Sequence, residues 1–247
     1  MKNAWYLKFS ETEVFNSAII VGDKSRLRLI QSYLTEVKVL NEDRGLLTIT
    51  GLFNGEKITV VAFGMGAPIA AVVCHELAYL GVSNILRLGT TMNLGQTKLG
   101  EYVLAESAVS QDGTSIAYDS SKTIFTASTS LNASILLTLT EHGITPQLGQ
   151  VVSCDGFYTE MMSIGSDDSF GVEEKHSNFE RLGYVGLDME TAAIFALGER
   201  LKINIASLCI ATVNGRTKTK LSEVERNLAE LNLSLVGLES LTRKVKI

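Results

Sequence analysis

Short apolar strands and amphipathic helices alternate along the whole chain, and this alternation constrains the fold more than any other feature. Strands that are apolar throughout and alternate with helices are typical of a largely parallel sheet with helices on both faces. The sequence therefore predicts an α/β fold. We expect strands at residues 17–21, 84–88 and 203–213, an antiparallel hairpin of 46–52 and 57–63 around Asn54-Gly55, and helices at 25–34, 69–80, 131–142, 191–201 and 221–245.

Composition indicates a globular protein. Of the 247 residues, 45% are hydrophobic and 20% are charged, which suffices for a buried core and excludes a predominantly disordered chain. The net charge of −5 argues against a nucleic-acid-binding protein, and no signal peptide or membrane-spanning run is recognisable. Cys74, Cys154 and Cys209 lie far apart, which indicates buried free thiols in a reducing compartment. We expect one cytoplasmic domain over residues 1–247, with neither nucleic acid nor membrane as a partner.

The carboxyl ends of the expected strands are the places to search for chemistry, because ligands of parallel sheets bind there. Gly22 follows the first strand and precedes a helix, where the backbone can approach an anion that the helix N-terminus attracts. Arg26 lies one helical turn later and can reach the same anion. An ordinary strand–helix turn with a solvated arginine explains these residues as well, so both interpretations stay open.

Arg87 lies in an apolar strand and is followed by Gly89, Thr90 and Thr91. Burying an unpaired guanidinium group costs several kcal/mol, so Arg87 needs a partner, either a carboxylate of the protein or an anionic ligand. We expect the strand to end at Gly89, with the threonines in the loop that follows. Two hydroxyls and a guanidinium group at the end of a strand would suit a bound oxyanion.

Asp188 and Glu190 flank Met189 immediately before an expected helix. If the segment is extended at Asp188, both carboxylates point to one side, and a carboxylate accepts two hydrogen bonds from a sugar diol. Acidic residues at a helix N-terminus also complement the helix dipole. The residues alone therefore allow a sugar-binding role and a purely structural one.

Seven motifs occur in a fixed order along nearly the whole chain: GDKSR, Arg44, FGMGAP, RLGTT, SCDGFY, GLDMET and ATVN. Together they resemble the nucleoside phosphorylase-I family, the uridine and purine nucleoside phosphorylases. The resemblance implies a three-layer α/β/α fold with a central mixed, largely parallel sheet, and a hexamer built as a trimer of homodimers. It also implies phosphate-dependent cleavage of a nucleoside into the free base and (deoxy)ribose 1-phosphate, with phosphate as co-substrate and no cofactor.

The resemblance also implies a role for individual residues, with Arg26, Arg87 and Glu190 as the catalytic ones. Phosphate binding is implied for Gly22, Arg26, Arg87 and Thr90, and for Arg44 of a neighbouring subunit. Ribose binding is implied for Tyr6, Thr90, Met189 and Glu190, with Glu190 on the two ring hydroxyls. Base binding is implied for Phe157, Met161, Ser163, Val213 and Asn214.

The base-binding stretch departs from the family pattern. Met161 and Ser163 stand where uridine phosphorylases have a Gln and an Arg, and Val213-Asn214-Gly215 stands where purine enzymes have an Asp that protonates the leaving base. Tyr6 replaces a histidine of the neighbouring subunit, and Gly45 replaces a glutamate of an interface metal site, so we expect no metal. An apolar pocket discriminates less than buried hydrogen-bonding groups do, which predicts weak base selectivity or a preference for a base other than uracil.

A uridine-type nucleoside phosphorylase is the first hypothesis, because Val213-Asn214 resembles that branch. The alternatives are a purine nucleoside phosphorylase, a nucleosidase of the same fold and a catalytically weak nucleoside-binding homologue. Residues 164–181 are polar and acidic, and we interpret them either as a mobile loop over the site or as a surface insertion.

Overall fold

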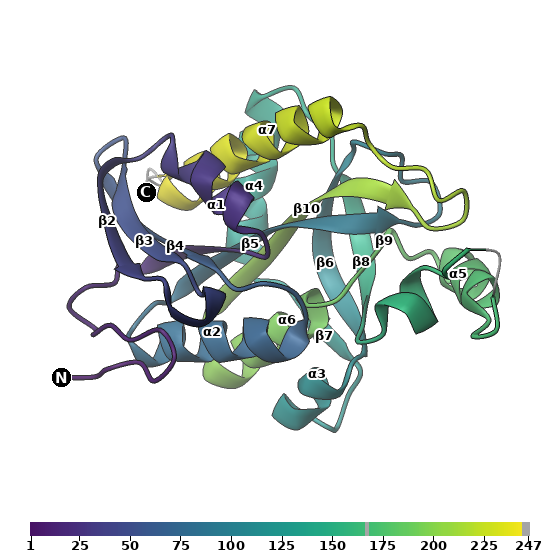
Figure 1. Cartoon of the computed structure of the whole chain (residues 1–247), viewed down its shortest axis with the longest axis horizontal. Coiled ribbons are helices and arrows are strands. Elements are labelled where there is room, and N and C mark those ends of the chain that lie inside the picture. The colour runs from purple at the N-terminus through teal and green to yellow at the C-terminus, as the bar shows by residue number, and fades with distance from the viewer. Residues whose placement is uncertain (166–167, 244–247) are drawn as a thin grey trace.

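The computed structural model describes residues 1–165 and 168–243 (Figure 1). The strands are β1 Ser17–Val21, β2 Thr35–Asn41, β3 Thr48–Phe53, β4 Glu56–Ala62, β5 Asn84–Asn93, β6 Tyr102–Gln111, β7 Ile124–Thr126, β8 Gln147–Cys154, β9 Gly186–Asp188 and β10 Asn204–Asn214. They join one mixed sheet in the order β10-β6-β8-β9-β5-β1-β4-β3-β2, with β7 beside β6. β5 pairs with β1, β9 and β10, so it lies in the middle of the sheet.

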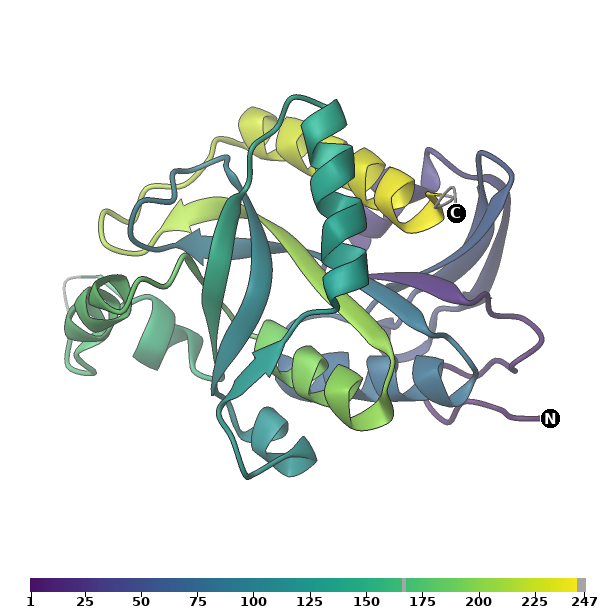
Figure 2. The same cartoon turned by 180° about the vertical axis from the view of Figure 1, so that it is seen from behind.

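Helices cover both faces of this sheet, as Figures 1 and 2 show. α1 (Lys24–Gln31), α4 (Thr129–Glu141) and α7 (Glu223–Thr242) lie over one face, and α2 (Ala67–Tyr79), α3 (Gly113–Tyr118) and α6 (Thr191–Leu201) lie over the other. A buried apolar cluster fills each interface, with Leu27 and Leu233 on the α1–α7 side and Leu77 and Phe195 on the other. The three-layer α/β/α architecture and the mixed, largely parallel sheet are confirmed.

The strand that contains Arg87 is longer than predicted. β5 continues through Gly89 to Asn93, because β10 goes on pairing with it beyond Leu88. The predicted loop at residues 89–91 is therefore wrong, and Thr90 belongs to the strand. The hairpin prediction is confirmed, since Asn54 and Gly55 join β3 to β4 with φ angles of 51° and 80°.

Residues 172–181 do not form a loop, which was one of the two interpretations of this stretch. They form α5 (Val172–Arg181), because Val172, His176 and Phe179 recur at helical spacing and are buried on one face. This helix lies beside a π-helical turn at Phe157–Met161. Ser166 and Asp167, from the same predicted loop, lie outside the described residues. β2, β6, β7, β8 and α3 have no counterpart among the elements expected from the sequence.

All three cysteines are buried free thiols, as predicted. Burial raises the pKa of Cys74 to about 12, which keeps this thiol protonated at neutral pH. Within residues 1–165 and 168–243, no helix is long and apolar enough to cross a bilayer.

Candidate active site

A cavity of about 660 Å³ opens where β1, β4 and β10 end, beside the second half of β5. α7 and the π-helical turn complete its lining. Segments that lie far apart in the sequence thus meet at one place. Among the residues expected to bind substrate, the cavity brings together Gly22, Arg26, Arg87, Thr90, Phe157, Met161, Met189, Glu190 and Val213.

Gly22 lies where two turns of the backbone touch. Its carbonyl oxygen accepts a hydrogen bond from Gly64 N at 3.0 Å, and a Cβ atom on Gly22 would lie 2.7 Å from Gly64 O. A larger residue would therefore push the turn after β1 away from the turn after β4. Asp23 then begins α1, because its side chain accepts a hydrogen bond from Ser25 N at 2.8 Å.

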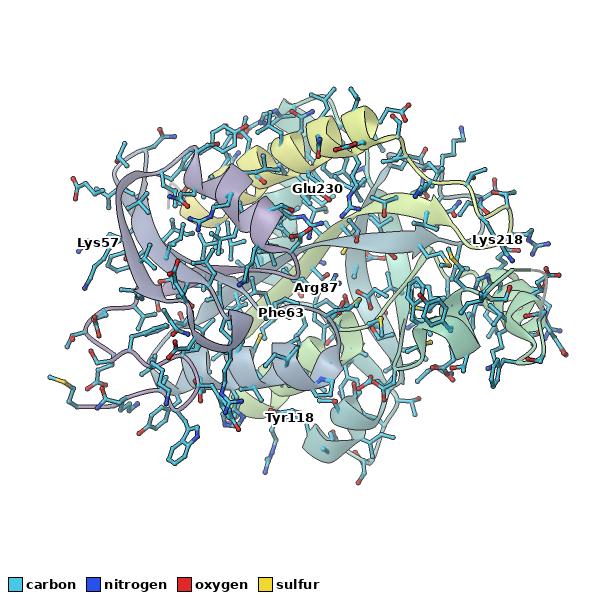
Figure 3. The ribbon with its side chains drawn as sticks, in the orientation of Figure 1. Lys57, Phe63, Arg87, Tyr118, Lys218 and Glu230 are labelled. Atoms are coloured by element: carbon cyan, nitrogen blue, oxygen red, sulfur yellow. The ribbon has the colours of Figure 1, made fainter. Side chains whose placement is uncertain are left out.

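Arg87 is buried at the centre of the molecule, with 4% of its surface exposed (Figure 3). Its Nη1 lies 3.0 Å from Asp188 Oδ2, and its Nη2 lies 2.5 Å from Glu190 Oε2. Nη1 also donates to Ser207 Oγ at 3.2 Å and to Cys209 Sγ at 2.8 Å. Burial opposes the charged form, but Cys209 and the two carboxylates raise the pKa of Arg87 well above its usual range. The protein itself therefore supplies the carboxylate partners that a buried arginine requires.

The two carboxylates differ in how fully the protein uses them. Asp188 accepts hydrogen bonds from the backbone N–H groups of Glu190 and Thr191 and from the Thr191 hydroxyl, besides its ion pair with Arg87. Among the residues that the structure describes, Glu190 has one partner for each oxygen, Gly66 N at 2.6 Å and Arg87. Each carboxylate oxygen has two lone pairs, so Glu190 can still accept hydrogen bonds from hydroxyl groups. The structural explanation fits Asp188, and sugar binding stays a prediction for Glu190.

Arg26 is not a solvated surface residue, since only 3% of its surface is exposed. Its Nη1 donates to Leu88 O at 3.1 Å, and its Nη2 donates to Glu230 Oε1 at 2.9 Å. Glu230 lies on α7, so this arginine joins α1 to both β5 and α7.

Arg226 is a residue of the cavity that we did not expect from the sequence. It lies on α7, and its Nε donates to Glu230 Oε1 at 2.9 Å. In the sequence, this contact was indicated by the spacing of four residues between Arg226 and Glu230 within a predicted helix. The same spacing is typical of an ordinary ion pair on a helix surface, so it did not single out either residue.

An apolar wall, defined here as Met92, Phe157, Met161, Leu187 and Val213, completes the cavity. Asp155 and Glu160 flank the wall residues Phe157 and Met161 in the sequence, but neither lines the cavity. Their carboxylates accept hydrogen bonds from Gly113 N at 2.9 Å and Gly156 N at 2.8 Å. Both carboxylates therefore already bind backbone N–H groups, and neither residue lines the cavity.

Four residues expected at the site do not line this cavity: Tyr6, Arg44, Ser163 and Asn214. The Arg44 guanidinium carbon lies 5.4 Å from the centre of the Tyr6 ring, so the structure brings these two together elsewhere on the chain. Asn214 Oδ1 accepts hydrogen bonds from the backbone of Arg216 and Thr217, and thereby closes the turn after β10. The binding roles expected for these four residues stay predictions.

His176, on α5, is buried next to the turn after β10. Only 3% of its surface is exposed, and a Cβ atom on Gly215 would lie 2.5 Å from its Cε1. Its Nε2 has no hydrogen-bonding partner among the described residues. Burial lowers the pKa of His176 below its usual value of 6.5, although contacts with the backbone of Glu160 and Met161 act in the opposite direction.

Acidification should therefore destabilise the fold through His176. Because the folded-state pKa is lowered, the unfolded chain binds a proton more readily, and stability falls as the pH drops through about 6.5 towards the folded-state pKa. We expect His176→Gln to lose less of its melting temperature than the wild type between about pH 7.5 and pH 5.5. The exposed His75 provides the matched control, His75→Gln, which should keep the wild-type pH dependence. Equal pH dependence in wild type and His176→Gln would contradict this account.

The chain is similar to known proteins over nearly its whole length. Residues 16–237 match the family model described as the phosphorylase superfamily. The sequence is 28% identical to that of a DeoD-type purine nucleoside phosphorylase of Clostridium beijerinckii, over 96% of this chain and 98% of that protein. A DeoD-type purine nucleoside phosphorylase of Shewanella denitrificans is also 28% identical, over 94% and 93% respectively. A crystal structure of uridine phosphorylase from Vibrio fischeri superposes with a TM-score of 0.86 and 27% identity, over 99% of both chains.

Proposed function

We propose a uridine-type activity for this chain. It belongs to the phosphorylase superfamily and is a nucleoside phosphorylase. It is therefore a pentosyltransferase that uses phosphate as co-substrate and needs no cofactor. One observation supports the proposal above all. Thr212 and Val213 stand at the end of β10 in the cavity, where a purine enzyme would need an acid to protonate the leaving base. The described acids that line the cavity are Asp23, Asp188 and Glu190, and none belongs to the apolar wall.

The proposed arrangement of substrates follows the positions of the expected binding residues in the cavity. Phosphate lies by Gly22, Arg26, Arg87 and Thr90, the ribose hydroxyls bind Glu190, and the base lies against the apolar wall. A phosphate oxygen then bonds to the anomeric carbon as the bond from that carbon to the base nitrogen breaks, and the electron pair leaves with the base. Two unit charges 4 Å apart interact by about 4 kcal/mol at an effective dielectric constant near 20, so fixed charges suffice to position phosphate.

Base selectivity should be weak, because the apolar wall offers thioether, aromatic and aliphatic contacts in place of hydrogen bonds. Apolar contacts discriminate by about 10–200-fold for a methylene-sized difference, whereas buried polar groups reach about 10⁴-fold or more. We expect kcat/KM for uridine, thymidine and inosine, each measured with phosphate, to lie within about 200-fold of one another. Uridine should be the best of them. Preference for uridine by more than about a thousandfold would mean that polar groups outside the apolar wall read the base.

The double variant Met161→Gln/Ser163→Arg tests the proposed base subsite by mutation. It restores the two polar side chains that uridine phosphorylases carry at these positions, and should raise uridine turnover relative to inosine. Met161→Leu combined with Ser163→Ala is the matched control, because it replaces both side chains without adding a hydrogen-bonding group. If both double variants shift the ratio equally, the proposed base subsite is wrong.

A purine nucleoside phosphorylase is the second candidate, supported by the 28% identity to the purine enzymes named above. The same measurement separates the candidates, because a purine enzyme would turn over inosine or adenosine faster than uridine. An acid would then have to reach the base from a segment other than the apolar wall.

We further propose that residues 1–247 act as one domain whose active site is completed by a second copy of the chain. The single sheet that the described strands form supports the first part. The position of Arg44 supports the second, because it is exposed, lies against Tyr6, and does not line the cavity of its own chain. A hexamer built from such dimers remains the expected assembly.

A further inference from the structure

The buried carboxylate of Glu230 joins two arginines at the cavity. Its Oε1 accepts from Arg26 Nη2 and from Arg226 Nε, each at 2.9 Å. Glu230 is 3% exposed and lies on the side of α7 that faces the sheet (Figure 3). Arg26 and Arg226 come from different helices, so this one oxygen sets their positions relative to each other.

The formal charges of the two arginine clusters have opposite signs. Arg87 lies between two carboxylates, Asp188 and Glu190, so that cluster carries one negative charge. Arg26 and Arg226 share the single carboxylate of Glu230, so that cluster carries one positive charge. Without Arg226, Arg26 and Glu230 would neutralise each other. Arg226 therefore supplies the positive charge that Arg26 and Glu230 leave unbalanced in this cluster.

Arg226 is also more open to a ligand than Arg26. Its side chain is 46% exposed and lines the cavity, whereas Arg26 is buried and its two terminal amino groups already donate to Leu88 O and Glu230. Within the described residues, the Nε atom of Arg226 has a hydrogen-bonding partner, and the other two nitrogen atoms of its guanidinium group have none. Its two terminal amino groups are therefore free to bind a ligand.

The charge of Arg226 also reaches the turn where phosphate is expected. Burial raises the pKa of Asp23, directly after Gly22, but hydrogen bonds from Ser25 and the charges of Arg26 and Arg226 lower it overall. Arg226 thus acts electrostatically on the same turn as Arg26.

We propose that Arg226 binds the phosphate co-substrate through its terminal amino groups, and that Glu230 is the residue that positions it. The assignment rests on the proposed place of phosphate beside Gly22, and it does not depend on which base is preferred. An arginine with its Nε held by a carboxylate keeps a planar pair of N–H donors, which matches two oxygens of a phosphate group.

Arg226→Met tests the assignment, because it removes the charge but keeps an unbranched chain. We expect KM for phosphate to rise by about ten- to a hundredfold, with KM for the nucleoside changed by less than about twofold. Arg226→Lys keeps the charge without the paired donors and should lie between wild type and Arg226→Met. The matched control is Arg216→Met, because Arg216 is 56% exposed, pairs with Glu180 and does not line the cavity. It should leave KM for phosphate unchanged.

Binding of inorganic phosphate without turnover gives an independent readout. We expect phosphate to raise the melting temperature of Arg226→Met less than that of the wild type. It should also raise that of Glu230→Gln less than that of the wild type, because Arg226 then lacks the carboxylate that holds its terminal amino groups in place. A rise in Glu230→Gln as large as in the wild type would contradict the positioning role of Glu230, and an unfolded Glu230→Gln would leave Arg226→Met to decide.

Two outcomes distinguish a wrong assignment of Arg226 from a wrong phosphate site. If the wild type binds phosphate and Arg226→Met binds it equally well, the assignment to Arg226 is overturned and the proposed function stands. If phosphate neither stabilises the wild type nor supports turnover of any nucleoside, the phosphate site itself is overturned, and the role of Arg226 with it.

Discussion

Arg87→Ala is expected to lower phosphorolysis by at least about a thousandfold, because it removes a fixed positive charge from the place where phosphate and ribose should meet. The same change leaves Asp188 and Glu190 facing each other in a buried site without their counter-ion. Breaking a buried ion pair in this way costs about 3–5 kcal/mol of folding free energy. Activity and melting temperature should therefore fall together, and activity alone cannot separate binding from stability.

A charge-matched double variant separates the two effects. Arg87→Ala combined with Asp188→Asn keeps one negative charge in the cluster, as in the wild type, and should regain part of the melting temperature. It should regain no phosphorolysis, because the guanidinium group is still missing. Recovery of activity along with stability would mean that Arg87 serves only to neutralise the buried carboxylates.

Mixing two inactive variants should restore activity if the site is shared between subunits. Arg44→Ala removes the residue expected to come from the neighbour, and Glu190→Ala removes the expected sugar ligand from the cavity. Each mixed dimer then holds one cavity with both residues intact. Random pairing of equal amounts makes half of the dimers mixed, so about a quarter of the wild-type activity should return after co-refolding.

The control for this experiment places both changes in one chain. The double variant Arg44→Ala/Glu190→Ala, co-refolded with the single variant Glu190→Ala, has no intact cavity in any pairing and should stay inactive. An absence of recovery in the first mixture, with dimers demonstrated by light scattering, would mean that Arg44 does not complete the partner's cavity.

Several cavity residues could be predicted from the sequence because they lie near the carboxyl ends of the predicted strands. Gly22 and Arg87 each stand next to an apolar run, and a parallel sheet brings the ends of its strands to one edge. The place of Glu190 near them was implied by the family resemblance, and the extended conformation of Gly186–Asp188 agrees with the condition under which both carboxylates share a side. Positions within strands were harder to predict. The extension of β5 beyond Leu88 depends on pairing with β10, more than a hundred residues away, which no local pattern reveals.

The partners of the buried arginines could not be predicted for the same reason. Arg87 required a carboxylate or an anion, but only the fold shows that Asp188 and Glu190 supply the carboxylates. Arg26 looked like a surface residue because Glu230, its counter-ion, lies on the last helix. The helix α5 was missed for another reason, since its buried face uses His176, a residue usually counted as polar.

The most direct test of the central claim is to incubate the wild-type protein with uridine, with and without inorganic phosphate, and to quantify uracil, ribose and ribose 1-phosphate. A phosphorylase that binds phosphate between Gly22 and Arg87 should form uracil and ribose 1-phosphate in equal amounts, and almost no uracil when phosphate is omitted. Release of uracil with free ribose at the same rate in both conditions would contradict the account, because it would show that water rather than phosphate attacks the sugar.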